Sequence, residues 1–254
     1  MKKIVALGRG GVGKSSFIAL MAKYLKSRKR GSILLIDADC DQNLADLLGL
    51  NLGQLQINTI SDLLFDLRYG KIEEKMKSFS LQQKIEYLIN QRALYEGDGF
   101  DLLSLGTKWA EGCYCQANNI LKGFISGLEK NYSYVLIDSP SGLEHLNRRL
   151  TSSIDDLFAI LDPTQKAFQN LKRARKIMTE IKIKFSNFYL LGNFRFRDEF
   201  IGLLEGNDEF KYIGKIEYDR SIEEFNLQGK SLFEIQEDSP MFISVKEVAS
   251  SLGY

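Results

Sequence analysis

A complete G-x-x-x-x-G-K-[ST] motif, the pattern of a phosphate-binding loop, lies close to the start of the chain. It comprises Gly8, Arg9, Gly10, Gly11, Val12, Gly13, Lys14 and Ser15. An apolar strand pattern precedes the motif over residues 2–7, and apolar residues recur at helical spacing directly after it. A strand, a glycine-rich loop and a helix in this order cradle the phosphates of a nucleotide. The motif therefore predicts an α/β fold and the binding of a nucleoside triphosphate.

Several positions of the loop have a chemical role in such a site. The glycines let backbone N–H groups close around phosphate oxygens, and the helix directs the positive end of its dipole at the same anion. Lys14 is expected to reach the β- and γ-phosphates, Ser15 to bind Mg²⁺ through its hydroxyl, and Ser16 to contribute to the same nucleotide site. Arg9 is a second cation in the loop. The loop does not need it to bind the phosphates of its own nucleotide, which suggests a partner subunit.

Strand and helix patterns alternate along the rest of the chain without a Pro/Gly/Ser-rich linker. The alternation predicts a doubly wound, mostly parallel sheet of about seven strands flanked by helices. The chain of 254 residues is expected to form a single domain. Residues 71–99 are highly charged and poorly periodic, and we expect an insertion of mixed helix and loop there. The expected strands cover residues 2–7, 33–37, 100–104, 133–138, 156–161, 187–192 and 211–216.

Charge and cysteine content restrict the partners and the compartment. The 34 Lys and Arg residues nearly balance the 33 Asp and Glu residues, so no overall attraction to nucleic acid or to anionic lipid is expected. The chain has no run of 18 apolar residues, and its start reads as a strand rather than a signal peptide, which predicts a cytoplasmic location. Three cysteines argue against a disulfide framework and favour a metal or redox role.

Two buried strand patterns end in carboxylates. Asp37 and Asp39 close the strand at 33–37, and Asp138 closes the strand at 133–138. Ligands in this architecture bind at the carboxyl ends of the strands, and an apolar strand with a terminal Asp is the Walker B arrangement that holds Mg²⁺. Gly142 follows in the next loop, where its backbone N–H could approach the γ-phosphate. These acids are expected to complete the nucleotide site.

A C-x-C pair, Cys113-Tyr114-Cys115, precedes an amphipathic helix pattern. A helix N-terminus lowers the pKa of nearby thiols, and thiolates are metal ligands. One pair supplies two ligands, whereas a twofold axis beside it would bring four thiolates together, which suits tetrahedral zinc or a square-planar soft metal. The alternative is a pair of small buried residues. His145, the single histidine, and Cys40 are both expected to be structural.

The phosphate loop and the strand-terminal acids together resemble the deviant Walker A class of ATPases, which includes septum-site, chromosome-partition and nitrogenase iron proteins. In that class the loop's second residue is a lysine that contacts nucleotide in the opposite subunit of a face-to-face dimer, and Arg9 stands at this position. The resemblance implies that Asp39 orients the attacking water and that Asp138 and Gly142 form a second switch. It also implies that Asn193 contacts adenine. No N-K-x-D guanine signature is present, so ATP is favoured over GTP.

The C-x-C pair, with Asn118 and Asn119 after it, resembles more closely the CooC-type maturation ATPases, which help insert nickel into carbon monoxide dehydrogenase. This resemblance implies a homodimer that uses ATP and Mg²⁺ and holds Zn²⁺ or Ni²⁺ between its subunits through Cys113 and Cys115. The implied client is a nickel-containing carbon monoxide dehydrogenase or a related metalloenzyme. Neither nucleic acid nor membrane is an expected partner.

Two alternatives from other functional classes remain. An iron–sulfur reductase of the nitrogenase iron protein type would bridge a [4Fe–4S] cluster between subunits, but that family separates its two cysteines widely in sequence. A partition or positioning ATPase would bind DNA or membrane. Its membrane branch ends in a basic amphipathic helix, whereas the C-terminal apolar face here is accompanied by Lys246 alone, which favours a helix that caps the core. That face comprises Met241, Phe242, Val245, Val248, Ala249 and Leu252.

Overall fold

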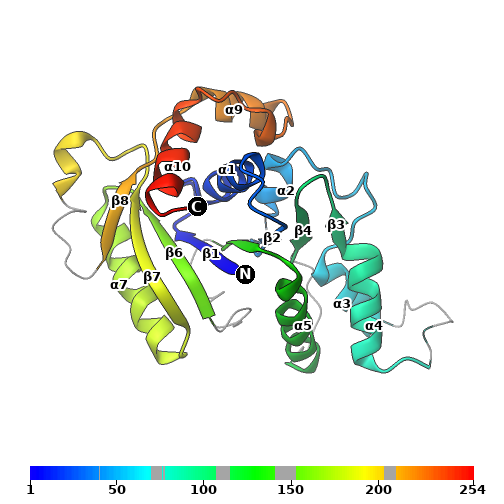
Figure 1. Cartoon of the computed structure of the whole chain (residues 1–254). Coiled ribbons are helices and arrows are strands. Elements are labelled where there is room, and N and C mark those ends of the chain that lie inside the picture. The colour runs from blue at the N-terminus through cyan, green and yellow to red at the C-terminus, as the bar shows by residue number, and fades with distance from the viewer. Residues whose placement is uncertain (40, 70–75, 77, 107–114, 141–152, 203–209) are drawn as a thin grey trace.

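The structure is a computed structural model that describes residues 1–39, 41–69, 76, 78–106, 115–140, 153–202 and 210–254. Its strands form one sheet in the spatial order β3-β4-β2-β5-β1-β6-β7-β8 (Figure 1). All neighbouring strands pair in parallel except β3, which runs antiparallel to β4. The strands are β1 (Lys2–Gly8), β2 (Ile33–Asp37), β3 (Leu94–Glu96), β4 (Asp101–Ser104), β5 (Tyr134–Asp138), β6 (Ser153–Leu161), β7 (Lys184–Gly192) and β8 (Lys211–Lys215). The expected doubly wound, mostly parallel sheet is confirmed.

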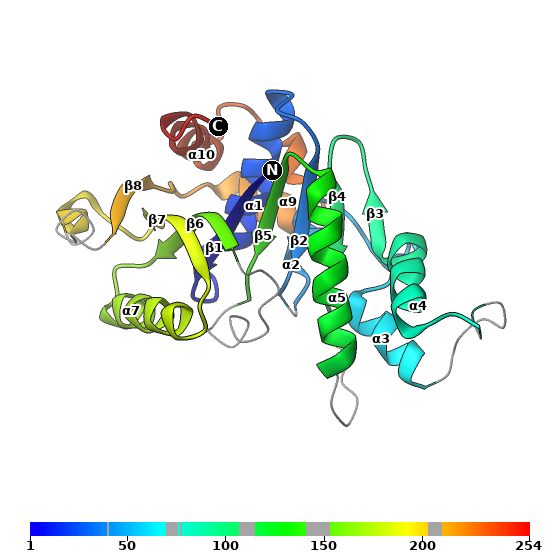
Figure 2. The same ribbon diagram turned by 60° about the horizontal axis from the view of Figure 1, so that its bottom comes forward.

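Helices cover both faces of the sheet, because successive side chains of each buried strand point to opposite faces. In β1, Ile4 and Ala6 pack against one helical layer, and Val5 and Leu7 pack against the other. Figure 2 shows the two layers on opposite sides of the strands. The first layer contains α1 (Lys14–Ser27), α2 (Asn43–Leu47), α9 (Arg220–Leu227) and α10 (Pro240–Ser251). The second contains α3 (Ile60–Arg68), α4 (Leu81–Leu88), α5 (Cys115–Leu128) and α7 (Gln165–Glu180).

Several helices begin at side chains that cap the backbone. Thr59 forms a capping box with Asp62 at the start of α3. Ser80 caps α4, Thr164 caps α7 and Ser239 caps α10. Short turns of other helix types complete the chain: η2 (Ile89–Ala93), η3 (Glu129–Asn131), η4 (Asp198–Phe200) and η5 (Leu232–Glu234).

The described part of residues 71–99, where an insertion of mixed helix and loop is expected, contains a strand as well as helices. It contains α4, the π-helical turn η2 and the antiparallel edge strand β3, which pairs Tyr95 with Leu102. Ile85, Leu88 and Ala93 are buried in the same core as the helices around them. The segment therefore extends the sheet and its second helical layer.

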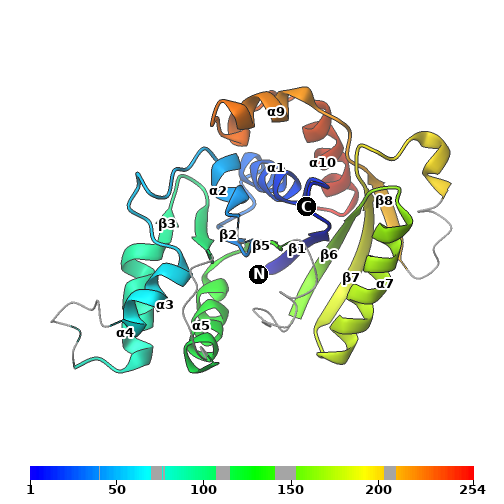
Figure 3. The ribbon, with the colours of Figure 1, turned by 180° about the vertical axis from the view of Figure 1, so that it is seen from behind.

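The C-terminal helix packs against α1 on the first face of the sheet (Figure 3). The side chains of its apolar face lie in the core, as expected, including Phe242 and Val245 at 0% exposure. The hydroxyl of Tyr254 donates to the buried carboxylate of Asp156 within β6. Among the described residues, the structure has no helix both long and apolar enough to span a bilayer.

Candidate functional site

The phosphate loop leaves the end of β1 and enters α1. Gly8 lies so close to β6 that a Cβ atom there would be 2.6 Å from the carbonyl oxygen of Ile160. Gly13 is the N-cap of α1 with φ of 99°, a left-handed conformation that glycine adopts without strain. These two glycines are therefore required by the shape of the loop. Of the four residues between them, Arg9 is partly buried, Gly10 and Gly11 are exposed, and Val12 is buried.

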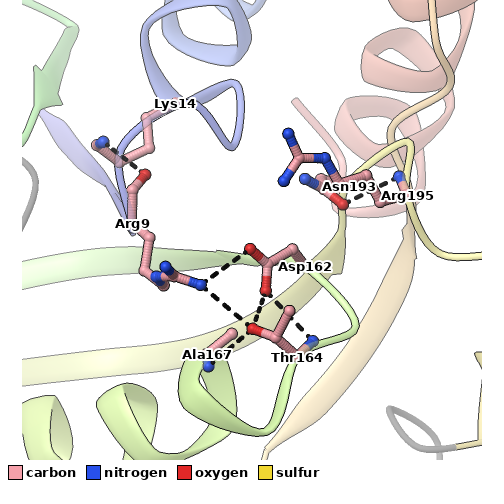
Figure 4. A network of polar contacts seen from close by, with 7 residues as sticks. All are labelled: Arg9, Lys14, Asp162, Thr164, Ala167, Asn193 and Arg195. Carbon is pink, nitrogen blue, oxygen red and sulfur yellow. Dashed lines mark hydrogen bonds and ion pairs between the residues drawn. The ribbon is translucent and has the colours of Figure 1, made fainter.

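Lys14 is the first residue of α1, and its side chain folds back over the loop. Its Nζ donates a hydrogen bond to the carbonyl oxygen of Arg9 at 3.3 Å (Figure 4). Burial lowers the pKa of Lys14, and the charges of Asp138 and Asp39 oppose that effect. The structure thus brings together the lysine and two of the acids that the sequence assigned to one site. Ser15 and Ser16 follow in the first turn of α1, both partly buried.

Asp37 organises the loop between β2 and α2. One of its carboxylate oxygens accepts a hydrogen bond from the backbone N–H of Asp39, and the other accepts from the N–H of Leu44, each at 3.1 Å. Its side chain is fully buried, and burial together with the nearby Asp138 raises its pKa to about 7. Asp39 stands at the start of that loop with 7% exposure. Asp37 therefore holds the backbone that carries Asp39 toward the phosphate loop.

Asp138 ends β5 beneath the phosphate loop, and both of its carboxylate oxygens are buried without a hydrogen-bond partner. Burial raises its pKa to about 6; the nearby hydroxyl of Ser15 and the charge of Lys14 act in the opposite direction. A buried carboxylate without hydrogen bonds is costly unless a cation binds it. Ser15 and Asp138 are oxygen donors, which Mg²⁺ prefers, so these two residues fit the ion expected with a nucleotide.

The Arg9 side chain extends from the loop toward the end of β6. Its Nη1 lies 3.3 Å from Oδ2 of Asp162 and 3.2 Å from Oγ1 of Thr164. Figure 4 shows the guanidinium and Lys14 directed away from each other. Arg9 is thus bound to its own chain, on the side opposite to Lys14.

Asn193 follows β7 and is fully buried. Its Oδ1 accepts a hydrogen bond from the backbone N–H of Arg195 at 3.0 Å, and its Nδ2 has no partner. Beside it, the rings of Phe194 and Tyr218 lie 5.7 Å apart and are 39% and 50% exposed. The unpaired amide donor next to two accessible rings is compatible with a nucleobase at this end of the sheet.

Four residues singled out in the sequence lie outside the described residues: Cys40, Cys113, Gly142 and His145. Cys115 is the first residue of α5, which returns from the carboxyl edge of the sheet. Within the described ranges, no three His, Cys, Asp or Glu side chains gather into a group that could hold a metal ion.

Asp162 and Thr164 are contacts of the loop that sequence reasoning missed. They follow β6 in the segment Asp162-Pro163-Thr164, which is a capping signal for the helix after it. Their contact with Arg9 depends on the pairing of β1 with β6. This pairing brings together segments that are far apart in the sequence, and 153 positions separate Arg9 from Asp162. Only the order of strands in the sheet brings them together.

The chain matches known proteins over most of its length. The family model described as "AAA domain" matches residues 1–189. An uncharacterized ATP-binding protein of Methanocaldococcus jannaschii is 34% identical over 254 residues, which cover 98% of this chain and 97% of that protein. The carbon monoxide dehydrogenase accessory protein CooC of Rhodospirillum rubrum is 27% identical over 241 residues, which cover 92% of this chain and 90% of that protein.

A solved structure has the same fold. The MinD cell division protein of Aquifex aeolicus superposes with a TM-score of 0.68 at 20% identity, over 99% of this chain and 96% of that chain. The similarity covers the phosphate loop, the sheet and both helical layers.

Proposed function

Because this chain belongs to the AAA-domain family of P-loop ATP-binding proteins, we propose that it is an ATP-hydrolysing maturation factor whose dimerisation depends on nucleotide. It would bind a metal through paired C-x-C motifs and assist nickel insertion into carbon monoxide dehydrogenase or a related metalloenzyme. The observation that carries this proposal is the sequence Cys113-Tyr114-Cys115, in a chain that is similar over 92% of its length to a carbon monoxide dehydrogenase accessory protein.

In this proposal the described residues of the site have separate roles in ATP hydrolysis. Lys14 binds the β- and γ-phosphates, and Asp39, held by Asp37, orients the attacking water. Ser15 and Asp138 would hold Mg²⁺, which neutralises charge on the phosphates when bound. Attack of the water on the γ-phosphorus breaks the bond to the β-phosphate oxygen and releases phosphate and ADP.

Base selection rests on Asn193. Its Nδ2 donor is buried without a partner, and its Oδ1 acceptor already binds the N–H of Arg195. A donor at this place suits N1 of adenine, which accepts a hydrogen bond where guanine carries an N–H donor, so the nucleotide is ATP in this proposal.

Arg9 and the two cysteines couple the nucleotide to the metal. In the proposed dimer Arg9 contacts the nucleotide bound to the opposite subunit. Two copies of Cys113 and Cys115 then meet at the twofold axis and supply four thiolates, the number that a tetrahedral zinc or a square-planar nickel site requires. Closing or opening the dimer would change this metal site.

The membrane-positioning alternative is less well supported. The apolar face of α10 is packed on α1, and Lys246 on the same helix is bound to Glu237 at 3.2 Å. A helix whose apolar face is in the core has no such face to insert into lipid.

Replacing cysteines tests the proposed metal site. We expect Cys113→Ser and Cys115→Ser each to abolish stoichiometric nickel or zinc binding and to leave ATP binding unchanged. Cys40→Ser, the third cysteine of the chain, is the matched control and should keep the metal. Unchanged metal content in the first two variants would remove the maturation role, and a brown iron–sulfur chromophore in protein purified without oxygen would favour the reductase instead.

A further inference from the structure

The carboxylate that binds Arg9 is largely withdrawn from water. The side chain of Asp162 is 4% exposed, whereas that of Arg9 is 36% exposed. Nη1 of Arg9 contacts both Asp162 and the hydroxyl of Thr164, at 3.3 and 3.2 Å. An ion pair with one partner buried is screened less than a pair between two surface side chains. The contact is therefore screened less by salt than an ordinary surface salt bridge.

Asp162, which accepts the hydrogen bond from Arg9, is held in place by hydrogen bonds to Thr164. Oδ1 of Asp162 accepts hydrogen bonds from the hydroxyl of Thr164 and from its backbone N–H. Thr164 is itself the N-cap of α7 and accepts from the N–H of Ala167 at 3.2 Å (Figure 4). Oδ2 of Asp162 remains to accept a hydrogen bond from Arg9. The guanidinium therefore binds a carboxylate whose position is fixed by the first turn of α7.

We propose that Asp162 is a positioning residue which, together with Thr164, retains Arg9 on its own subunit until a nucleotide-bound dimer forms. This inference rests on the proposed function, in which Arg9 contacts the nucleotide of the opposite subunit. To reach across an interface the guanidinium has to leave Asp162, so the ion pair within the chain competes with the contact between chains. The triphosphate of ATP carries more negative charge than the diphosphate of ADP, and it therefore competes better for Arg9.

The dimer dissociation constant measures this competition. We expect Asp162→Asn to lower the constant about tenfold in the presence of Mg²⁺ and a non-hydrolysable ATP analogue, measured by sedimentation equilibrium. The factor follows from two ion pairs, one in each subunit, each worth about threefold. Glu224→Gln, which removes an exposed acid paired with Arg220, is the charge-matched control and should leave the constant unchanged.

The same substitution made in the Arg9→Ala chain separates a positioning role of Asp162 from a purely structural role. Asp162 also supports the start of α7, so its replacement could act through the helix alone. In the Arg9→Ala chain we expect Asp162→Asn to have no effect on dimerisation, because the competing pair is already absent. Thermal unfolding of each variant checks that the fold is kept.

Different failures have different meanings. If the wild-type chain dimerises with the ATP analogue and Asp162→Asn leaves the constant equal or raises it, the positioning role is wrong and the dimer switch stands. The positioning role is also wrong if the effect of Asp162→Asn persists in the Arg9→Ala chain. If the wild-type chain and Asp162→Asn both stay monomeric, the proposed dimer switch is overturned, and the role of Asp162 with it.

Discussion

Asp37 and Asp138 are register partners on the adjacent parallel strands β2 and β5, and both side chains are fully buried. The pairing places two carboxyl groups side by side at the carboxyl edge of the sheet, next to the phosphate loop. Each has a raised pKa, to about 7 for Asp37 and about 6 for Asp138, mainly because of burial. In the chain without ligands, ionising this pair opposes folding, and binding of a cation would relieve that cost.

The stability of the ligand-free chain should fall as pH rises. The folded-state pKa values of both acids lie above 3.8, so the folded chain holds protons that the unfolded chain has released. Their contribution is fully present below about pH 4 and is lost as pH rises through about 6 and 7. We expect the free energy of unfolding to fall with pH by about 2 kcal/mol less in Asp138→Asn than in the wild-type chain. Urea unfolding in chelator from about pH 5 to about pH 8 measures it. An exposed acid, Asp46→Asn, is the control and should keep the wild-type slope.

Binding of Mg²⁺ and nucleotide should show the opposite dependence on pH. A carboxyl group binds Mg²⁺ in its ionised form, and Asp138 gains a proton as pH falls through about 6. We expect the Mg²⁺-dependent part of ATP affinity to weaken below that pH and to be absent in Asp138→Asn at every pH. Titration calorimetry with and without Mg²⁺ gives both quantities. A Mg²⁺ effect of equal size in the variant would show that Asp138 is no ligand.

Replacing Asn193 should remove the preference for adenine. Its unpaired Nδ2 is the expected contact to the base, so Asn193→Ala should weaken ATP binding about tenfold and bring it close to GTP binding. Asn187 lies on β7, the strand that Asn193 follows, where its Nδ2 binds Asp156 at 2.7 Å, and Asn187→Ala is the matched control. That control should keep the ratio of ATP to GTP affinity. The same ratio in both variants would place base selection elsewhere.

Two neighbouring residues of α10 test whether this helix belongs to the core. Phe242 is fully buried with the Nζ of Lys23 4.5 Å from its ring centroid, whereas Ile243 is 38% exposed. We expect Phe242→Ala to lower the free energy of unfolding by about 3–5 kcal/mol and Ile243→Ala to change it by less than about 1 kcal/mol. Chemical unfolding curves decide this. A stable Phe242→Ala chain that has lost binding to anionic vesicles would instead support a membrane-positioning protein.

Much of the fold and of the nucleotide site follows from local patterns in the sequence. The strand before Gly8 and the helix after Lys14 are as expected, because an apolar strand and an amphipathic helix have different periods. Asp37 and Asp138 end their strands as predicted, and parallel pairing then brings them to one edge. These features depend on signals that lie within a few residues of each other.

Other features depend on contacts between residues that are far apart in the sequence. The strand β3 has three residues and pairs on one side only, so it carries no alternating pattern that could identify it. The contact between Arg9 and Asp162 needs β1 beside β6, and no local signal gives that neighbour relation. Burial, which raises the pKa of Asp138, likewise comes from the packed sheet rather than from residues next to it.

The composition and mass of the assembled protein test the proposed function most directly. Native mass spectrometry of the wild-type chain with Ni²⁺ or Zn²⁺, with and without Mg²⁺ and ATP, reports subunit number and metal content together. We expect a dimer with about one metal ion in the presence of ATP, and loss of the ion in the chain carrying both Cys113→Ser and Cys115→Ser. A monomer without metal under the same conditions would contradict a nucleotide-switched dimer that holds its metal between two C-x-C motifs.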